Sequence, residues 1–397
     1  MPDVATIDLI DDLRRFDLLD GDQLDDLRRL TTDRCLDTRG LAKALVQRGW
    51  LTLFQANHLL AGNGNILSLG PYRILDLLGE GGLSQVFKAR HVAYKLIVAL
   101  KVIRPEILDQ NEGRKQFLRE MKALAKLNHP NVVQICDSDQ TGETCYFAME
   151  YVEGTDLGKF VRLSGGLPIP QASIFIRQAA LGLQHAHENN LVHRDIKPVN
   201  LFLIQTTIGG KSEPLIKILD WGLASVKLEG AILSDPKGPK GIVGTVDYLS
   251  PEQALNPRGA DIRSDIYSLG CSFYYLLTGR PPFPTPKLVH KLKQHQEAEP
   301  TPVESLRDDM PAELSAILKR MLAKNPADRF QTPAAVALAL HPFTRPQNPA
   351  PAEELPTSFP NLKNTPLPGS LARPTCVPRP KDSPQPAAKS MADTSQS

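Results

Sequence analysis

The stretch that most constrains this chain is residues 193–200, which read His-Arg-Asp-Ile-Lys-Pro-Val-Asn. Asp195 and Asn200 lie five positions apart, a spacing that does not suit one face of a helix, and Pro198 between them prevents a regular helix. The apolar residues 191–192 and 201–204 on either side are typical of strands. The pattern therefore predicts a loop between two strands that carries a proton acceptor, a cation and a metal-ligating amide.

Length and composition allow one large domain together with smaller regions. The chain has 397 residues, of which 41% are hydrophobic, enough to bury sizeable cores. A net charge of +2 gives no reason to expect nucleic acid or a membrane surface as a partner. No apolar run approaches the roughly 18 residues of a membrane span, and the acidic start lacks the features of a signal peptide. The five cysteines are scattered without a C-x-x-C pair, so we expect no disulfide framework, no zinc site and a cytoplasmic location.

Residues 1–68 differ from the rest of the chain in pattern and charge. Apolar side chains recur at helical spacing in four segments, over residues 7–19, 24–30, 41–46 and 54–60. Thr52 is a candidate N-cap for the last of them. Among the first 40 residues there are eleven aspartates and six arginines, so the early helices are acidic. The pattern predicts a compact helical bundle with a solvated acidic face, then a linker at residues 63–65. Binding a partner, dimerising the chain and shielding the next domain all stay open as its role.

A glycine-rich turn between two predicted strands comes next. Residues 72–78 are typical of a strand, and Gly-Glu-Gly-Gly-Leu-Ser-Gln-Val at residues 79–86 leads into another. Glycines let backbone N–H groups approach phosphate oxygens, because they have no Cβ. The run matches G-x-G-x-x-G-x-V except that Ser84 replaces the third glycine. A plain hairpin turn is the alternative. The strand on each side argues against a dinucleotide site, whose glycine turn opens a helix.

Two charged residues are predicted to pair across a strand and a helix. Lys101 lies within the apolar strand-like run at residues 98–103, where its ammonium group needs a partner or a ligand phosphate to offset desolvation. Glu120 is the candidate partner, in a segment over residues 116–127 with apolar residues at helical spacing. A surface ion pair of little consequence is the alternative.

Further acidic and basic residues occur in order along the second half of the chain. Asp220 follows the strand-like residues 215–219 and precedes Trp221 and a glycine, which suits a metal ligand on a turn. Later come Glu252, Asp265 and Arg329, and we expect Glu252 to pair with Arg329. As isolated residues, each would be an ordinary surface charge.

With these motifs in this order, residues 72–341 resemble a eukaryotic-like serine/threonine protein kinase, in particular soluble bacterial members with a preceding helical region. The resemblance implies an α+β, bilobal fold, with a small β-rich N-lobe and a larger helical C-lobe, after a small all-α region at residues 1–68. It rests on the glycine-rich turn together with Lys101, Glu120, Asp195, Asn200, Asp220, Glu252, Asp265 and Arg329.

The resemblance also implies a role for each site residue. Asp195 would orient the substrate hydroxyl as the catalytic base with Lys197 beside it, and Asn200 and Asp220 would hold Mg²⁺. Met149 would be the gatekeeper of the adenine pocket. The residues implied to bind ATP are Gly79, Glu80, Gly81, Gly82, Ser84 and Val86 over the phosphates, Lys101 with Glu120 on the α- and β-phosphates, Ala99, Glu150 and Val152 around adenine, and Asp156 on the ribose.

The chain departs from the family pattern at several places. Trp221 stands where phenylalanine is usual, and residues 205–213 read as an exposed hairpin insert. Related kinases often carry a phosphorylated threonine a few residues before Gly244, but residues 235–243 contain no hydroxyl side chain, and Ser234 is the nearest upstream. Arg194 would therefore lack a phosphate partner, so we expect activity that does not depend on phosphorylation of this segment. Thr245 is expected to serve Asp195 and Lys197 and, with Lys197, is typical of the serine/threonine class.

Residues 342–397 differ again, because they hold thirteen of the 34 prolines and few aromatic residues. Such a composition predicts a disordered tail, with a docking or autophosphorylation segment as the alternative. For the whole chain, three functions are open: a protein kinase acting on protein Ser/Thr hydroxyls in signalling, a pseudokinase that binds ATP as a scaffold, and a small-molecule phosphotransferase. The presence of Lys101, Asp195 and Asp220 argues against the second. The later charged motifs, which resemble a protein-substrate platform, argue against the third. The resemblance implies protein substrates, and the helical region is a candidate to bind a protein partner.

Overall fold

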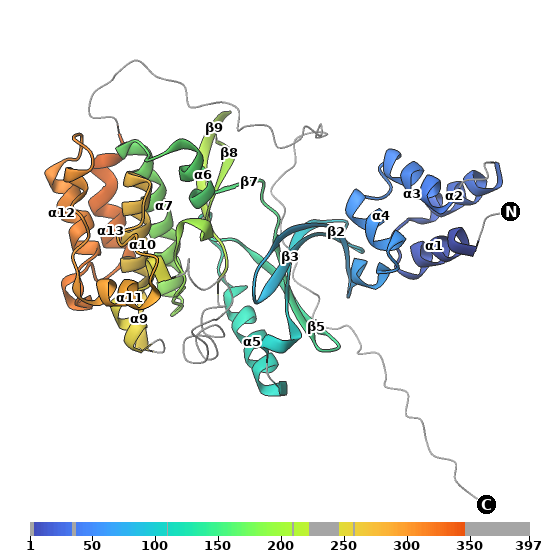
Figure 1. Ribbon diagram of the computed structural model, residues 1–397, viewed down its shortest axis with the longest axis horizontal. Helices are drawn as coiled ribbons and strands as arrows, with labels where there is room; N and C mark the ends of the chain where they lie inside the picture. The colour runs from blue at the N-terminus through green and yellow to red at the C-terminus, as the bar shows by residue number, and fades with distance from the viewer. Residues whose placement is uncertain are drawn as a thin grey trace, which may run out of the picture.

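The computed structural model describes residues 4–33, 37–108, 110–208, 210–221, 246–256 and 259–345. Three parts follow one another along the molecule in Figure 1: an N-terminal helical unit, a lobe built on a β-sheet, and a larger helical lobe. The bilobal α+β architecture and the preceding helices predicted from the sequence are confirmed. The predicted tail lies almost entirely outside the described residues.

The N-terminal unit consists of four helices around a core of its own. They are α1 (Val4–Arg15), α2 (Gly21–Asp33), α3 (Thr38–Gln47) and α4 (Leu53–Leu60), followed by the 3₁₀ helix η1 (Gly64–Leu67). Leu13, Leu41 and Leu45 of this core have no exposed surface. Thr52 caps α4 as predicted, in a capping box with Gln55. The predicted linker is part of η1 instead, and Gly64 packs so closely against the unit that an added Cβ would meet the Phe16 ring.

The N-lobe is a six-stranded antiparallel sheet with strand order β1-β2-β3-β4-β6-β5. The strands are β1 (Ser68–Leu69), β2 (Tyr72–Glu80), β3 (Ser84–His91), β4 (Ile97–Ile103), β5 (Ile135–Thr141) and β6 (Thr144–Glu150). The short helix η2 (Pro105–Ile107) leads to α5 (Gln110–Leu124), which packs on one face. Side chains alternate along β4, so that Ala99 joins the main core while Leu100 joins a small core on the opposite face.

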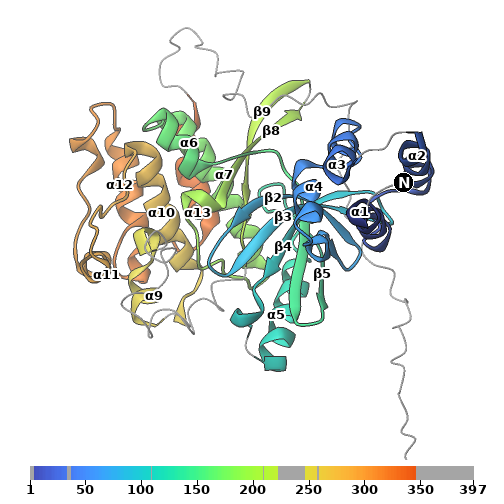
Figure 2. The ribbon, with the colours of Figure 1, turned by 45° about the vertical axis from the view of Figure 1, so that its right-hand side comes forward.

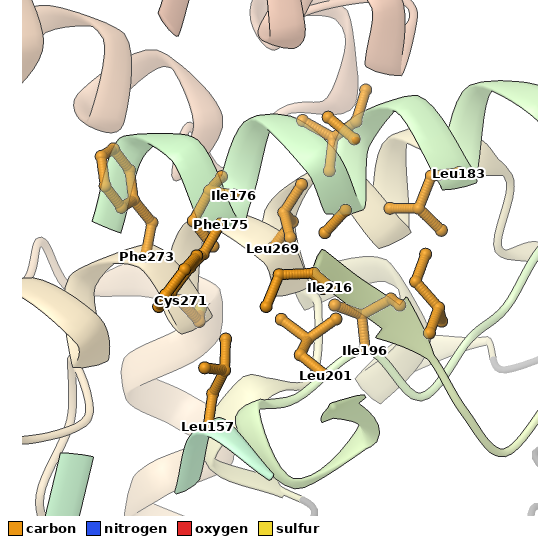
Figure 3. Packing of buried hydrophobic residues seen from close by; sticks show 14 of the residues in the cluster. Leu157, Phe175, Ile176, Leu183, Ile196, Leu201, Ile216, Leu269, Cys271 and Phe273 are labelled. Atoms are coloured by element: carbon orange, nitrogen blue, oxygen red, sulfur yellow. The ribbon is translucent and has the colours of Figure 1, made fainter. Parts of the chain in front are cut away.

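The C-lobe surrounds two long buried helices, α7 (Ile169–Glu188) and α10 (Ile262–Thr278). Helix α10 is buried along nearly its whole length, as expected for a helix that is apolar all round. Figure 3 shows Phe175, Ile176 and Leu183 of α7 packing with Leu269 and Phe273 of α10 and with side chains of the neighbouring strands. The remaining elements are β7 (Gly154–Asp156), α6 (Leu157–Ser164), η3 (Pro198–Asn200), β8 (Leu201–Ile208), β9 (Lys211–Ile218), η4 (Val246–Tyr248), α9 (Pro251–Leu255), α11 (Leu288–Glu297), η6 (Val303–Ser305), α12 (Ala312–Met321), η7 (Pro326–Asp328), α13 (Pro333–Leu340) and η8 (His341–Thr344).

Several local predictions can be compared with these elements. Strands β8 and β9 pair antiparallel through Gln205 and Pro214 to Ile208 and Lys211, which confirms the predicted hairpin. Residues 191–192 form no strand. The predicted end of the kinase region at residue 341 falls inside η8, where buried Phe343 extends the core beyond that point. Of the five cysteines, Cys145 and Cys271 are free and buried.

Candidate active site

Helix α10 holds the loop of residues 193–200 by its backbone. The two carboxylate oxygens of buried Asp265 accept hydrogen bonds from the backbone N–H groups of His193 and Arg194, each at 2.7 Å. Burial raises the pKa of Asp265 to about 7, although both N–H groups favour its charged form. Arg194 takes a left-handed backbone conformation with φ of 64°. The loop is therefore fixed where it turns, before its reactive side chains.

The ring of His193 ties this loop to the end of β9. Its Nε2 lies 2.9 Å from the Leu219 carbonyl oxygen, and its Nδ1 accepts a hydrogen bond from the Asp195 backbone N–H. Burial lowers the pKa of His193 to about 4, which suits a neutral ring with one donor and one acceptor. Trp221 packs edge-on to His193 with ring centroids 4.6 Å apart and donates to the Ile218 carbonyl. The indole N–H thus makes a bond that the phenylalanine usual at this position could not make.

The side chains of Asp195, Lys197 and Asn200 lie together on this loop. The ammonium group of Lys197 lies 3.0 and 2.9 Å from the two carboxylate oxygens of Asp195, which is 8% exposed. The Asn200 side-chain nitrogen donates to the Asp195 backbone carbonyl at 2.8 Å. The carboxamide oxygen is therefore the atom that Asn200 can offer to a cation.

Lys101 pairs with a different carboxylate from the one expected. Its ammonium group lies 2.7 Å from Oδ1 of Asp220, and the lysine is 2% exposed. The Glu120 carboxylate accepts a hydrogen bond from Gln116 one helical turn away, and no ion pair joins it to Lys101 in the part of the chain described. A buried ammonium needs one close carboxylate to offset its desolvation. Asp220, at the end of β9, provides it here.

The glycine-rich turn joins β2 and β3 beside Lys101. Gly79 pairs with Val86, and Val86 in turn is opposite Lys101 on β4. The turn closes with a hydrogen bond from the Gly81 N–H to the Ser84 carbonyl at 2.9 Å. The side chain of Glu80 is paired with Arg104, so this loop residue offers its backbone to a ligand. The turn and the lysine are therefore held in one continuous ladder.

The connection between the lobes contains the predicted adenine-binding segment. Met149 is buried opposite Ala99, the residue predicted to frame adenine. The Glu150 carboxylate accepts from buried Lys217 at 2.6 Å and from the Gln134 backbone N–H at 2.9 Å. Its side chain is therefore engaged away from any base. Asp156 caps α6 through the Lys159 N–H at 2.7 Å, and Val152 is partly exposed between them.

The predicted pair of Glu252 and Arg329 is confirmed. The guanidinium group of Arg329 reaches both carboxylate oxygens of Glu252, at 2.7 and 2.8 Å. Burial tends to raise the pKa of Glu252, but hydrogen bonds and charge from Arg329, with help from Ser264, lower it overall. Sequence reasoning missed a second pair beside it, in which buried Lys291 of α11 contacts Asp247 of η4. A lysine on a polar helix gives no sequence signal that it is buried.

Residues 222–245 lie outside the described residues. The expectations for Thr245, Ser234 and the hydroxyl-free segment at 235–243 fall there.

Comparison with known proteins decides the family. The family model for the protein kinase domain matches residues 72–344, about two thirds of the chain. The chain belongs to the protein kinase family. Within the part of this kinase that the structure describes, no helix has the length and apolar character needed to cross a membrane.

The relatives of this kinase are bacterial serine/threonine protein kinases by name. Serine/threonine-protein kinase PknB of Mycobacterium leprae is 35% identical over 267 residues, which cover 66% of this chain and 41% of that protein. Serine/threonine-protein kinase Pkn1 of Myxococcus xanthus is 37% identical over 281 residues, covering 68% and 39%. The chain thus spans about two fifths of the length of the curated relatives it matches. The crystal structure of the Mycobacterium tuberculosis PknI kinase domain is similar in fold, with a TM-score of 0.53 and 27% identity over 69% of this chain and 96% of that one.

Proposed function

We propose that this protein is an ATP-dependent kinase that transfers the γ-phosphate of ATP to serine or threonine hydroxyl groups of proteins, in a signalling role. The observation that carries the proposal is the contact of Lys197 with both carboxylate oxygens of Asp195, on a loop fixed to α10 by Asp265. Lys101 and Asp220 meet beside this loop, so the phosphate-binding and metal-binding residues of the family are present together.

The residues fit the chemistry of phosphoryl transfer, in which catalysis is mainly positioning and charge stabilisation. Asp195 is suited to accept the hydrogen bond of the attacking hydroxyl and to take its proton as the new O–P bond forms and the bond between the γ-phosphorus and ADP breaks. Lys197 keeps that carboxylate in place and offsets negative charge beside it. With nucleotide bound, Lys101 is expected to hold the α- and β-phosphates with Glu120 as its partner. In that step Lys101 would exchange its present partner, Asp220, for Glu120.

The donor set suits Mg²⁺, which commonly takes one or two protein ligands and completes its shell with phosphates and water. Asn200 offers its carboxamide oxygen, because its nitrogen is bound to the Asp195 carbonyl. Asp220 offers a carboxylate at the end of β9. Among the residues that the structure describes, no three histidine, cysteine or acidic side chains form a metal cage. When bound, Mg²⁺ would neutralise phosphate charge.

Protein substrates are favoured over small molecules by the surface next to the catalytic loop. Gln253 of α9 donates to the Arg194 backbone carbonyl at 2.9 Å, which links this loop to the segment fixed by Glu252 and Arg329. Helix α11 contacts the same segment through Lys291 and Asp247. Such a braced segment beside the reactive carboxylate is suited to receive a peptide. The cytoplasmic location and a partner for the helical unit stay predictions.

The test is incubation of the full chain with γ-labelled ATP, Mg²⁺ and a generic basic protein, with acid hydrolysis of the product. Labelled phosphoserine or phosphothreonine is the expected result. Nucleotide binding without any transfer would instead identify a pseudokinase. Transfer only to small hydroxyl compounds would identify a small-molecule phosphotransferase.

A further inference from the structure

The N-terminal helical unit contacts the N-lobe at the base of the hairpin of β2 and β3, with several hydrogen bonds to the first half of β2. Figures 1 and 2 show α4 as the helix of the unit nearest the β2 and β3 strands. The Gln55 amide donates to the Ile74 carbonyl at 2.8 Å, and the Thr52 hydroxyl donates to the Leu75 carbonyl at 2.5 Å. Arg73 adds bonds to the carbonyl and carboxylate of Asp17. Three consecutive residues of β2 are therefore held by the helical unit.

These contacts begin where the pairing of β2 with β1 ends. Strand β1 pairs only with Tyr72 and Arg73, so from Ile74 onward β2 has no strand partner on that side among the described residues. Leu75 is also skipped in the pairing with β3, where the register shifts between Ile74 and Asp76. An irregularity of this kind leaves backbone groups without ladder partners. Thr52, the N-cap of α4, and Gln55 donate hydrogen bonds to the Leu75 and Ile74 carbonyls at this point. Helix α4 therefore covers the edge of β2 where its pairing with β1 ends.

The same helix also contacts the second strand of the glycine-rich hairpin. The ring of Phe54 lies 6.3 Å from that of Phe87 on β3, which is 7% exposed and opposite Leu77. Gln55 is 3% exposed, and its side chain also accepts from the Thr52 N–H in the capping box. Both the amide nitrogen and the amide oxygen of Gln55 are therefore hydrogen-bonded, and α4 contacts both strands at the base of the hairpin.

Beyond these contacts the β2 strand of the hairpin is exposed, and it is held only through its pairing with β3, which in turn pairs with β4 from Ser84 to Arg90. Residues Asp76 to Glu80 are all exposed, in contrast to the buried Tyr72 and Ile74. From Leu75 to the turn at Gly81 the strand extends about 20 Å at roughly 3.3 Å per residue. A tilt of about 10° at Leu75 would therefore move the turn by roughly 3 Å, about the length of one hydrogen bond. The angle set at Leu75, together with the pairing of β3 with β4, therefore influences where the N–H groups of the turn lie.

We propose that α4 positions the glycine-rich hairpin for ATP, and that Thr52 and Gln55 are positioning residues for nucleotide binding. The proposal rests on the proposed function and gives the helical unit a role within the kinase itself. Neither residue lies in the glycine-rich turn or the catalytic loop, so their effect is on where the turn lies.

The test uses pairs of variants that separate the hydrogen bonds from the packing. Thr52→Val removes the hydroxyl at constant shape, Thr52→Ser retains it, and Gln55→Leu removes the amide. Gln47→Leu, on the exposed end of α3, is the matched control for a glutamine change. Affinity for ADP is measured directly by titration on the full chain, and the KM values for ATP and for protein substrate are measured beside it. Circular dichroism checks that each variant is folded.

Thr52→Val and Gln55→Leu are expected to weaken ADP binding and raise the KM for ATP by roughly three- to tenfold, the range for one lost hydrogen bond. The KM for protein substrate stays unchanged, and Thr52→Ser and Gln47→Leu behave as wild type. A purely structural role would lower the folded fraction without changing the affinity of what remains folded. Unchanged ADP affinity in folded Thr52→Val and Gln55→Leu would overturn the proposal. Because ADP binding needs no turnover, a wild type that binds but does not transfer phosphate contradicts only the proposed function.

Discussion

Replacement of Arg329 by leucine is expected to destabilise the C-lobe strongly. Arg329 has no exposed surface, and all five of its N–H donors are used. Two reach the Glu252 carboxylate and three reach the backbone carbonyls of Ala323, Arg263 and Lys324, at 2.7 to 2.9 Å. Arg329→Leu leaves a carboxylate that is 23% exposed without its cation, and three carbonyls without donors.

The expected magnitude follows from these groups. Removal of one partner of a buried pair costs about 3–5 kcal/mol of unfolding free energy. For a domain of this size about 1 kcal/mol corresponds to roughly 2–4 °C, so a fall in Tm of about 10 °C is expected. Thermal and urea unfolding of the full chain at pH 7 measure it. Lys293→Met is the control, because the ion pair of Lys293 with Glu297 is 70% and 64% exposed and should contribute about 0.5 kcal/mol or less.

The pH dependence provides an independent check on the same pair. The folded-state pKa of Glu252 is lowered from 4.5 by Arg329 against the opposing effect of burial. A carboxyl whose pKa is lowered on folding stabilises the protein above its unfolded pKa, and that stability is lost as the pH falls through the folded value. The difference in unfolding free energy between wild type and Arg329→Leu should therefore become smaller below about pH 4.5. If Arg329→Leu lowers the unfolding free energy by less than about 1 kcal/mol at pH 7, or if the difference from wild type does not depend on pH, the assigned role of this pair is wrong.

Other expected outcomes concern activity and domain organisation. Lys101→Met should remove most phosphotransfer in radiolabel assays while the far-UV circular dichroism spectrum stays that of wild type; wild-type turnover would contradict its role. A fragment of residues 72–345 should fold and bind ADP, more weakly than the full chain, and an insoluble fragment would show that the helical unit completes the core. Lys291→Met should raise the KM for protein substrate, because it releases Asp247 in the segment beside the catalytic loop, with the KM for ATP unchanged. Ser234→Ala and phosphatase treatment should leave turnover unchanged, and a large drop in either would reveal a phosphate switch.

Sequence order predicted the family and several of the contacts that the structure contains. Glu252 and Arg329 are 77 positions apart, yet both belong to motifs whose place in the fold is fixed, so their pairing was predictable. The hairpin of β8 and β9 was predictable because a glycine pair lies in a largely polar stretch between two apolar runs. Thr52 was recognisable as a cap because capping depends on residues three positions apart.

The contacts that sequence did not predict depend on how separate elements are placed. Lys101 needs a carboxylate, but two motif carboxylates are candidates, and the position of β9 relative to β4 selects Asp220. The second bond of the Thr52 hydroxyl, to Leu75, requires α4 to lie against β2, which no local pattern encodes. Residues 191–192 are apolar because they lie next to a buried loop, so a strand-like composition arose without a strand.

We propose that Asp195 serves as the base that orients the acceptor hydroxyl in an active serine/threonine kinase. The most direct measurement is the rate of label transfer from γ-labelled ATP to a basic protein by wild type and by Asp195→Asn, with the phosphorylated residue identified by acid hydrolysis. Asp195→Asn keeps the shape of the side chain but removes the charge that meets Lys197. We expect phosphoserine or phosphothreonine from the wild type and loss of most transfer in the variant, with ADP affinity retained. Equal rates for the two proteins, or no transfer by wild type that binds ADP, would contradict it.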